Sequence, residues 1–174
     1  SRKRGTGTGS PSAQTGDPGM PTTLKDRFAA VADSERAVGR HSKLITGIGF
    51  SPDSSELVSS SMDNTAIVWR VSDGKLRSGP NISGSADSLG GAAFSPDGSR
   101  IAVGSNSRFS GYIKNGLKVR FKNTTEVWNI EDDRRVMKLD GHPTGITDVV
   151  FSRNGEWIAS SSLDNTIKLW ETAT

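Results

Sequence analysis

Two sets of serine, histidine and aspartate in this 174-residue chain contain the residue types of a hydrolytic triad. The members are His41, Ser61 and Asp63 in one set, and His142, Ser162 and Asp164 in the other. An enzyme needs one nucleophile, yet the histidine and the aspartate are 22 residues apart in both sets. Neither serine lies in a Gly-x-Ser-x-Gly elbow. The duplication therefore favours an architectural role, and we predict that the chain is not an enzyme.

Other residues that could hold a ligand fit simpler roles. Asp53, Asp97 and Asn154 stand in Ser-x-Asp or Ser-x-Asn turns, and none has a second acid at a spacing suited to a metal ion. The alternating glycines of residues 5–10 lack the Gly-Lys-Ser/Thr of a phosphate loop. With two histidines and no cysteine in the chain, we expect no metal site and no cofactor.

An internal repeat organises the elements that must position these residues. The turn motif that begins at Phe50 recurs at Phe94 and Phe151, and the stretch Ser59–Thr65 recurs almost unchanged at Ser160–Thr166. Alternating or apolar-rich runs bounded by turn signals predict short strands. The predicted strands are 44–51, 56–61, 66–71 and 75–78, then 100–105, 125–130 and 134–139, then 145–152, 156–162 and 166–170. Four short antiparallel strands in about 40–45 residues are typical of a propeller blade.

Composition limits the remaining possibilities. Hydrophobic residues make up 32% of the chain, and no apolar run is long enough for a membrane-spanning helix. Residues 1–22 are rich in Gly, Ser, Thr and Pro and predict a disordered tail, within a non-propeller segment 1–38. Residues 24–36 favour a short helix over a lead-in strand. The lack of cysteine and of an apolar leader is compatible with an intracellular protein of the cytoplasm or nucleus.

These motifs resemble the WD-repeat β-propeller family over residues 39–174. The repeats cover about 41–71, 85–130 and 141–171, and the terminal Trp of the family stands at Trp69, Trp128 and Trp170. The resemblance implies an all-β fold of antiparallel four-stranded blades, incomplete at about three blades. Closed propellers have about four to eight blades. We therefore expect a piece of a larger propeller, or half of an oligomeric one that self-associates through its open blade edges.

The family's structural tetrad can be assigned residue by residue in two repeats. It would comprise His41, Ser61, Asp63 and Trp69 in the first, and His142, Ser162, Asp164 and Trp170 in the third. In this arrangement the serine hydroxyl links the imidazole to the buried indole N–H. The middle repeat departs from the pattern, because Ser85 stands where the histidine is expected and Lys122 lies next to the aspartate position, while Ser105 and Trp128 remain.

Residues 106–122 form an insertion between the second and third strands of the middle repeat. The insertion carries five Lys or Arg residues and no acid, with aromatic residues among them. Three interpretations stay open: a contact for an acidic partner or nucleic acid, a solvated disordered loop, and an artefact of the gene model. The candidate contact residues are Arg108, Tyr112, Lys114, Lys118 and Arg120.

In the resembled family, positions near the histidine and before the aspartate commonly touch partners. They map here to Leu44, Thr46, Met62, Ser88, Thr147 and Leu163. The resemblance therefore implies a non-catalytic scaffold for protein partners, with no membrane contact. One alternative is the recognition segment of a larger signalling NTPase or ubiquitin ligase. A second alternative is a nucleic-acid-associated protein that uses the basic insertion.

Overall fold

The computed structural model describes residues 38–77, 82–83, 88–107, 112–114, 117–119 and 123–172. All regular secondary structure in these residues is β-strand, which confirms the all-β prediction. They belong to one compact unit, Ala37–Thr174. The predicted tail and the predicted helix over 24–36 lie outside the described residues.

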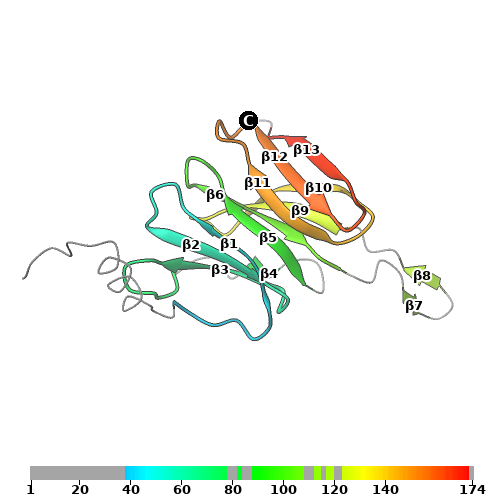
Figure 1. The fold of residues 1–174 in the computed structure, drawn as a ribbon, viewed down its shortest axis with the longest axis horizontal. Helices are drawn as coiled ribbons and strands as arrows, with labels where there is room; N and C mark the ends of the chain where they lie inside the picture. The colour runs from blue at the N-terminus through cyan, green and yellow to red at the C-terminus, as the bar shows by residue number, and fades with distance from the viewer. Residues whose placement is uncertain are drawn as a thin grey trace, which may run out of the picture. The chain divides into compact units, whose positions relative to one another are not determined.

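Three antiparallel sheets follow one another along the chain, and we call them blades 1, 2 and 3 (Figure 1). Blade 1 comprises β1 (Ile45–Phe50), β2 (Glu56–Ser61), β3 (Thr65–Arg70) and β4 (Ile82–Ser83) in that order. Blade 2 has the order β10 (Arg135–His142), β9 (Asn123–Asn129), β6 (Arg100–Ser105) and β5 (Leu89–Phe94). Blade 3 comprises β11 (Ile146–Phe151), β12 (Trp157–Ser162) and β13 (Ile167–Glu171).

The repeated turn motif closes the first hairpin of every blade. In blade 1 the Ser51 hydroxyl donates to Asp53 at 2.6 Å, and the Asp53 carboxylate accepts the Ser55 amide at 3.0 Å. The same bonds form in the other two turns, with an asparagine at position 154. The fourth residue has a positive φ in each turn, 61° at Ser54 and 73° and 75° at the equivalent glycines. The turn chemistry read from the sequence thus fixes the register of each hairpin.

The weaker fourth strand is only partly as predicted. In blade 1, Leu76 forms an isolated bridge with Trp69, and the short β4 pairs farther along β3. In blade 2, β10 runs to His142, three residues beyond the predicted end. Within the described residues, blade 3 contains three strands.

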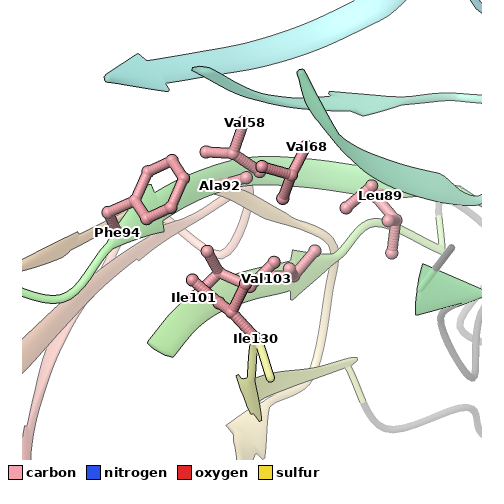
Figure 2. Packing of buried hydrophobic residues seen from close by; sticks show 9 residues of the cluster. Val58, Val68, Leu89, Ala92, Phe94, Ile101, Val103 and Ile130 are labelled. Atoms are coloured by element: carbon pink, nitrogen blue, oxygen red, sulfur yellow. The ribbon is translucent and has the colours of Figure 1, made fainter. Parts of the chain in front are cut away.

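The hydrophobic core lies between the blades. Val58, Ala66 and Val68 of blade 1 pack against Leu89, Ala92, Phe94, Ile101 and Val103 of blade 2, as Figure 2 shows for most of the cluster. A second cluster joins Ala102 and Val127 of blade 2 to Ile146, Val149 and Ile158 of blade 3. Each sheet thus buries one face against each neighbouring blade, as the period-2 alternation of a strand allows.

The innermost strands of the three blades begin at the same end of the unit. β5 contacts both β1 and β11, and Figure 1 shows it lying between them. The Thr46 hydroxyl near the start of β1 donates to the Leu89 and Gly90 carbonyls at 2.9 and 2.7 Å. A Cβ added to Gly90 would lie 2.1 Å from the Ile146 carbonyl oxygen at the start of β11. The loops that precede these three strands therefore share one surface, which we call the rim.

Candidate functional site

A chain of hydrogen bonds supports the rim of blade 1. The Trp69 Nε1–H donates to the Ser59 hydroxyl at 2.7 Å, and Ser59 Oγ lies 2.7 Å from His41 Nε2. His41 Nδ1 lies 3.1 Å from an Asp63 carboxylate oxygen. His41 and Trp69 are 9% and 7% exposed, so the chain satisfies polar atoms that burial would otherwise leave unpaired. The bond directions place a proton on His41 Nδ1.

Blade 3 repeats this chain atom for atom. Trp170 Nε1–H donates to Ser160 Oγ at 2.9 Å, which lies 2.9 Å from His142 Nε2. His142 Nδ1 contacts Asp164 at 2.8 Å. In both blades the indole and imidazole rings meet edge to face, with interplanar angles of 78° and 76°. Two identical assemblies in one unit are a scaffold feature, as the duplicated spacing predicted.

The predicted serines Ser61 and Ser162 are wrong, because the serines that join histidine to tryptophan are Ser59 and Ser160. Residues two apart on a strand share a face, so all four point to the same side of their sheets. Ser61 lies at the end of β2, where its hydroxyl accepts the Asp63 amide at 3.0 Å and donates to the Lys43 carbonyl at 3.2 Å. Ser162 plays the same part with Asp164 and Gly145.

Threonines that the sequence reasoning missed complete each assembly. The Thr65 hydroxyl and amide both donate to Asp63, at 2.5 and 3.0 Å, and Thr166 binds Asp164 in the same way at 2.5 and 2.9 Å. The intervening asparagines, Asn64 and Asn165, take positive φ values of 69° and 66°. The repeated Asp-Asn-Thr was the available signal, because a short acid two residues before a threonine favours such a turn.

These bonds lower the pKa values of both aspartates. Burial opposes ionisation of Asp63, but the Thr65 hydroxyl, the Ser42 and Thr65 amides and His41 outweigh it and hold its pKa well below the usual value. The Thr166 hydroxyl, with His142 and the Thr166 amide and against some desolvation, lowers the pKa of Asp164 to about 2. Pro143 replaces Ser42 in blade 3 and has no N–H to donate. Both aspartates therefore remain ionised acceptors at neutral pH.

Blade 2 lacks this assembly. Val103 occupies the position of Ser59, because Ile101 pairs with Trp128 as Leu57 pairs with Trp69. The Trp128 Nε1 and the Thr124 hydroxyl are buried without a hydrogen-bond partner, and the Arg135 guanidinium lies 5.9 Å from the Trp128 ring centroid. Ser105 instead accepts the Thr124 amide at 2.7 Å. Ser85 and Lys122 lie outside the described residues.

The predicted contact residues of the rim fall into two groups. Leu44 and Leu163 are exposed at 67% and 51%, and the half-buried Met62 donates its amide to the Leu44 carbonyl at 2.9 Å. The other three hydroxyls have partners within the fold. Thr46 binds β5, Ser88 donates to the Asn106 carbonyl, and the exposed Thr147 lies 2.8 Å from the Ser161 hydroxyl. Apolar side chains are thus the free groups among these six residues.

The insertion leaves the fold at the rim. β6 ends beside the start of β5, where the Asn106 amide donates to the Ser88 carbonyl at 2.8 Å. The described part of the insertion is a hairpin of β7 (Tyr112–Lys114) and β8 (Leu117–Val119), in which Ile113 pairs with Lys118. Arg108 and Arg120 lie outside the described residues, and the backbone alone is described for Tyr112, Lys114 and Lys118.

We expect Ser59→Ala to lower the free energy of unfolding by about 1–3 kcal/mol, because it leaves the Trp69 Nε1–H and His41 Nε2 unpaired. Urea unfolding measures the loss, and NMR of the indole N–H measures its protection from exchange. Protection should vanish in Ser59→Ala and persist in the control Ser61→Ala, which does not contact the indole. Loss of protection in the control variant alone would contradict the assignment.

We expect acid to destabilise the unit. An aspartate whose pKa is lowered on folding contributes stability above its unfolded value, near 3.8, and that contribution is lost as the pH falls through the folded value, about 2 for Asp164. The melting temperature should therefore be flat above pH 5 and fall steadily between about pH 4 and pH 2. The double variant Asp63→Asn and Asp164→Asn should show a shallower fall. A parallel decline in both proteins would contradict this origin.

Two searches of the described residues bear on the remaining expectations. No helix there is long and apolar enough to cross a membrane. No three His, Asp or Glu side chains of those residues gather where they could hold a metal ion.

Comparison with known proteins follows from this geometry. The family model described as "WD domain, G-beta repeat" matches residues 34–70 and 133–171, which contain the polar assemblies of blades 1 and 3. The chain belongs to the WD-repeat family. Blade 2, which lacks the assembly, lies between the two matches.

Several curated proteins are similar over most of the chain. Pre-mRNA-processing factor 19 homolog 2 of Arabidopsis thaliana is 24% identical over 75% of this chain. Transcriptional corepressor LEUNIG_HOMOLOG of Arabidopsis thaliana and small ribosomal subunit protein RACK1y of Oryza sativa subsp. japonica are each 29% identical over 75% of it. The matched stretches span 22%, 19% and 34% of these three relatives. The names differ widely, so the similarity identifies the family and no shared activity.

Proposed function

We propose that the chain is a non-catalytic scaffold that binds a protein partner through its rim. The observation that carries the proposal is the exposure of Leu44 and Leu163 beside turns that the buried polar assemblies support. Apolar side chains on a rigid, desolvable surface are what a protein partner uses as anchors. The relatives named for splicing, transcription and the ribosome support a role within a larger assembly inside the cell.

The duplicated Ser-His-Asp geometry supports a role without catalysis. Each imidazole is held between Asp and a Ser hydroxyl that also accepts an indole N–H, and both histidines are buried, at 9% and 1% exposure. A substrate carbonyl would have to reach a hydroxyl that lies beneath the histidine. The same atoms serve instead to fix the turns from which the rim residues project.

The basic insertion supplies a second contact to the same proposal. The insertion leaves β6 at the rim, and Lys114 and Lys118 lie on its hairpin. We propose that it favours an acidic segment of the partner. The alternative of a nucleic-acid ligand is distinguished by retention on a polyanion column. Retention that Lys114→Glu with Lys118→Glu abolishes, in the absence of any captured protein, would favour nucleic acid.

The experiment compares capture from a cell extract by three immobilised proteins. They are the wild type, the rim variant Leu44→Asp with Leu163→Asp, and the control Leu76→Asp, whose side chain is 56% exposed on the outer part of blade 1. The proposal expects proteins that the wild type and the control both retain and the rim variant loses. Identical retention by all three would overturn it.

A further inference from the structure

We propose that two copies of this chain pair head to tail, with the outer face of blade 1 packed on the outer face of blade 3. We call these the leading face and the trailing face. The leading face carries Ile45, Ile48 and Phe50, which are 48%, 67% and 62% exposed. The trailing face carries Val150, Ile167 and Leu169, which are 51%, 74% and 67% exposed.

The repeat shows what covers the leading face. Phe50 and Ile48 occupy the same register as Phe94 and Ala92 of blade 2, because Leu57 and Ile101 pair opposite the two phenylalanines. In blade 2 these residues are 8% and 5% exposed, and they pack against Val58, Ala66 and Val68 of blade 1 (Figure 2). In blade 3 the equivalent Val149 is 1% exposed against blade 2. The leading face is therefore built like two faces that the molecule already buries.

The trailing face is equivalent to the other half of those interfaces. Leu169 pairs with Ala159 as Val68 pairs with Val58, and Ile167 stands at the register of Ala66. Val58, Ala66 and Val68 are 0%, 0% and 2% exposed, because blade 2 covers them. The same positions in blade 3 are the most exposed large apolar groups of its outer strands. The trailing face of one copy thus matches the leading face of another in the way blade 1 matches blade 2.

The occupant we assign is a second copy of this chain, because each copy carries both halves of the interface. Pairing a leading face with a trailing face is heterologous, so it closes a ring only at a set number of copies. Two copies of three blades give six blades, within the range of about four to eight for closed propellers, whereas three copies exceed it. A closed pair buries both apolar faces of each copy at once.

Sedimentation velocity of the purified chain tests this inference. The expected species has twice the 18.5 kDa chain mass and folded circular dichroism. Ile48→Asp disables the leading face and Leu169→Asp the trailing face, so each variant alone should be monomeric. Leu44→Asp, an equally exposed apolar residue of the rim, is the control and should remain a pair.

Mixing the two variants gives the decisive result. The mixture retains one intact interface, formed by the leading face of Leu169→Asp and the trailing face of Ile48→Asp, and should recover a species of twice the chain mass. A variant that had merely misfolded would not recover. A folded wild-type monomer, open-ended oligomers, or a pair that survives either single variant would overturn the inference. These outcomes do not depend on the rim, so they are separate from the test of the proposed function.

Discussion

Trp69→Ala should lower the free energy of unfolding by about 3–5 kcal/mol, among the largest effects of any single substitution in blade 1. The ring is 7% exposed, its N–H donates to Ser59 at 2.7 Å, and Gly39 packs so closely that a Cβ there would lie 2.1 Å from the ring. Removing the indole leaves a cavity and two unpaired polar atoms. Equilibrium urea unfolding measures the loss.

Two further variants separate packing from hydrogen bonding at this site. Trp69→Phe keeps most of the ring volume but removes the donor, so its loss should be smaller than that of Trp69→Ala. Trp170→Ala should also cost less, because Trp170 is half-buried and blade 3 has three strands in the described residues. Equal losses in Trp69→Ala and Trp170→Ala would contradict the role assigned to burial.

Gly90→Ala should destabilise the unit by about 1–3 kcal/mol or more, because it forces the inner strands of blades 2 and 3 apart. The added Cβ would lie 2.1 Å from the Ile146 carbonyl oxygen, and backbone cannot move aside as a flexible side chain can. The Gly90 carbonyl also accepts the Thr46 and Ser60 hydroxyls, so a shift of β5 disturbs the contact with blade 1 as well. Thermal and urea unfolding report the change.

Gly49→Ala is the matched control for this glycine. Gly49 lies on β1, the inner strand of blade 1, and a Cβ there would meet the Ala92 carbonyl oxygen at 3.3 Å. The neighbouring atoms need to move by only a few tenths of an ångström, so the loss should be clearly smaller than for Gly90→Ala. Equal stability of Gly90→Ala and the wild type would contradict the close packing of the inner strands.

The sequence predicted the blades well because the repeat repeats their turns. Phe50, Phe94 and Phe151 each end an inner strand before a Ser-x-Asp or Ser-x-Asn turn, and hydrophobic alternation around these turns sets the register. The pairing of buried faces was less accessible. It depends on which side of each sheet meets a neighbouring blade, and the leading face differs from its equivalents in exposure, not in residue type.

The polar assemblies show where sequence reasoning stops. The spacing brought His41, Asp63 and Trp69 together, but three consecutive serines at 59–61 offered no signal for which one reaches the histidine. Register decides it. Trp69 pairs with Leu57, so its indole N–H reaches the next residue on the same face, Ser59. The same register explains blade 2, where Val103 leaves Trp128 Nε1 unpaired.

The central claim is that the rim binds a protein partner through apolar anchors, and titration calorimetry tests it most directly. The titrant is a purified protein that the wild type captures and the rim variant loses. If Leu44 and Leu163 are anchors, the variant Leu44→Asp with Leu163→Asp should bind at least about tenfold more weakly, since truncating an anchor costs about 2 kcal/mol or more. Leu76→Asp should bind as the wild type does. Equal affinity of the rim variant and the wild type would contradict the claim.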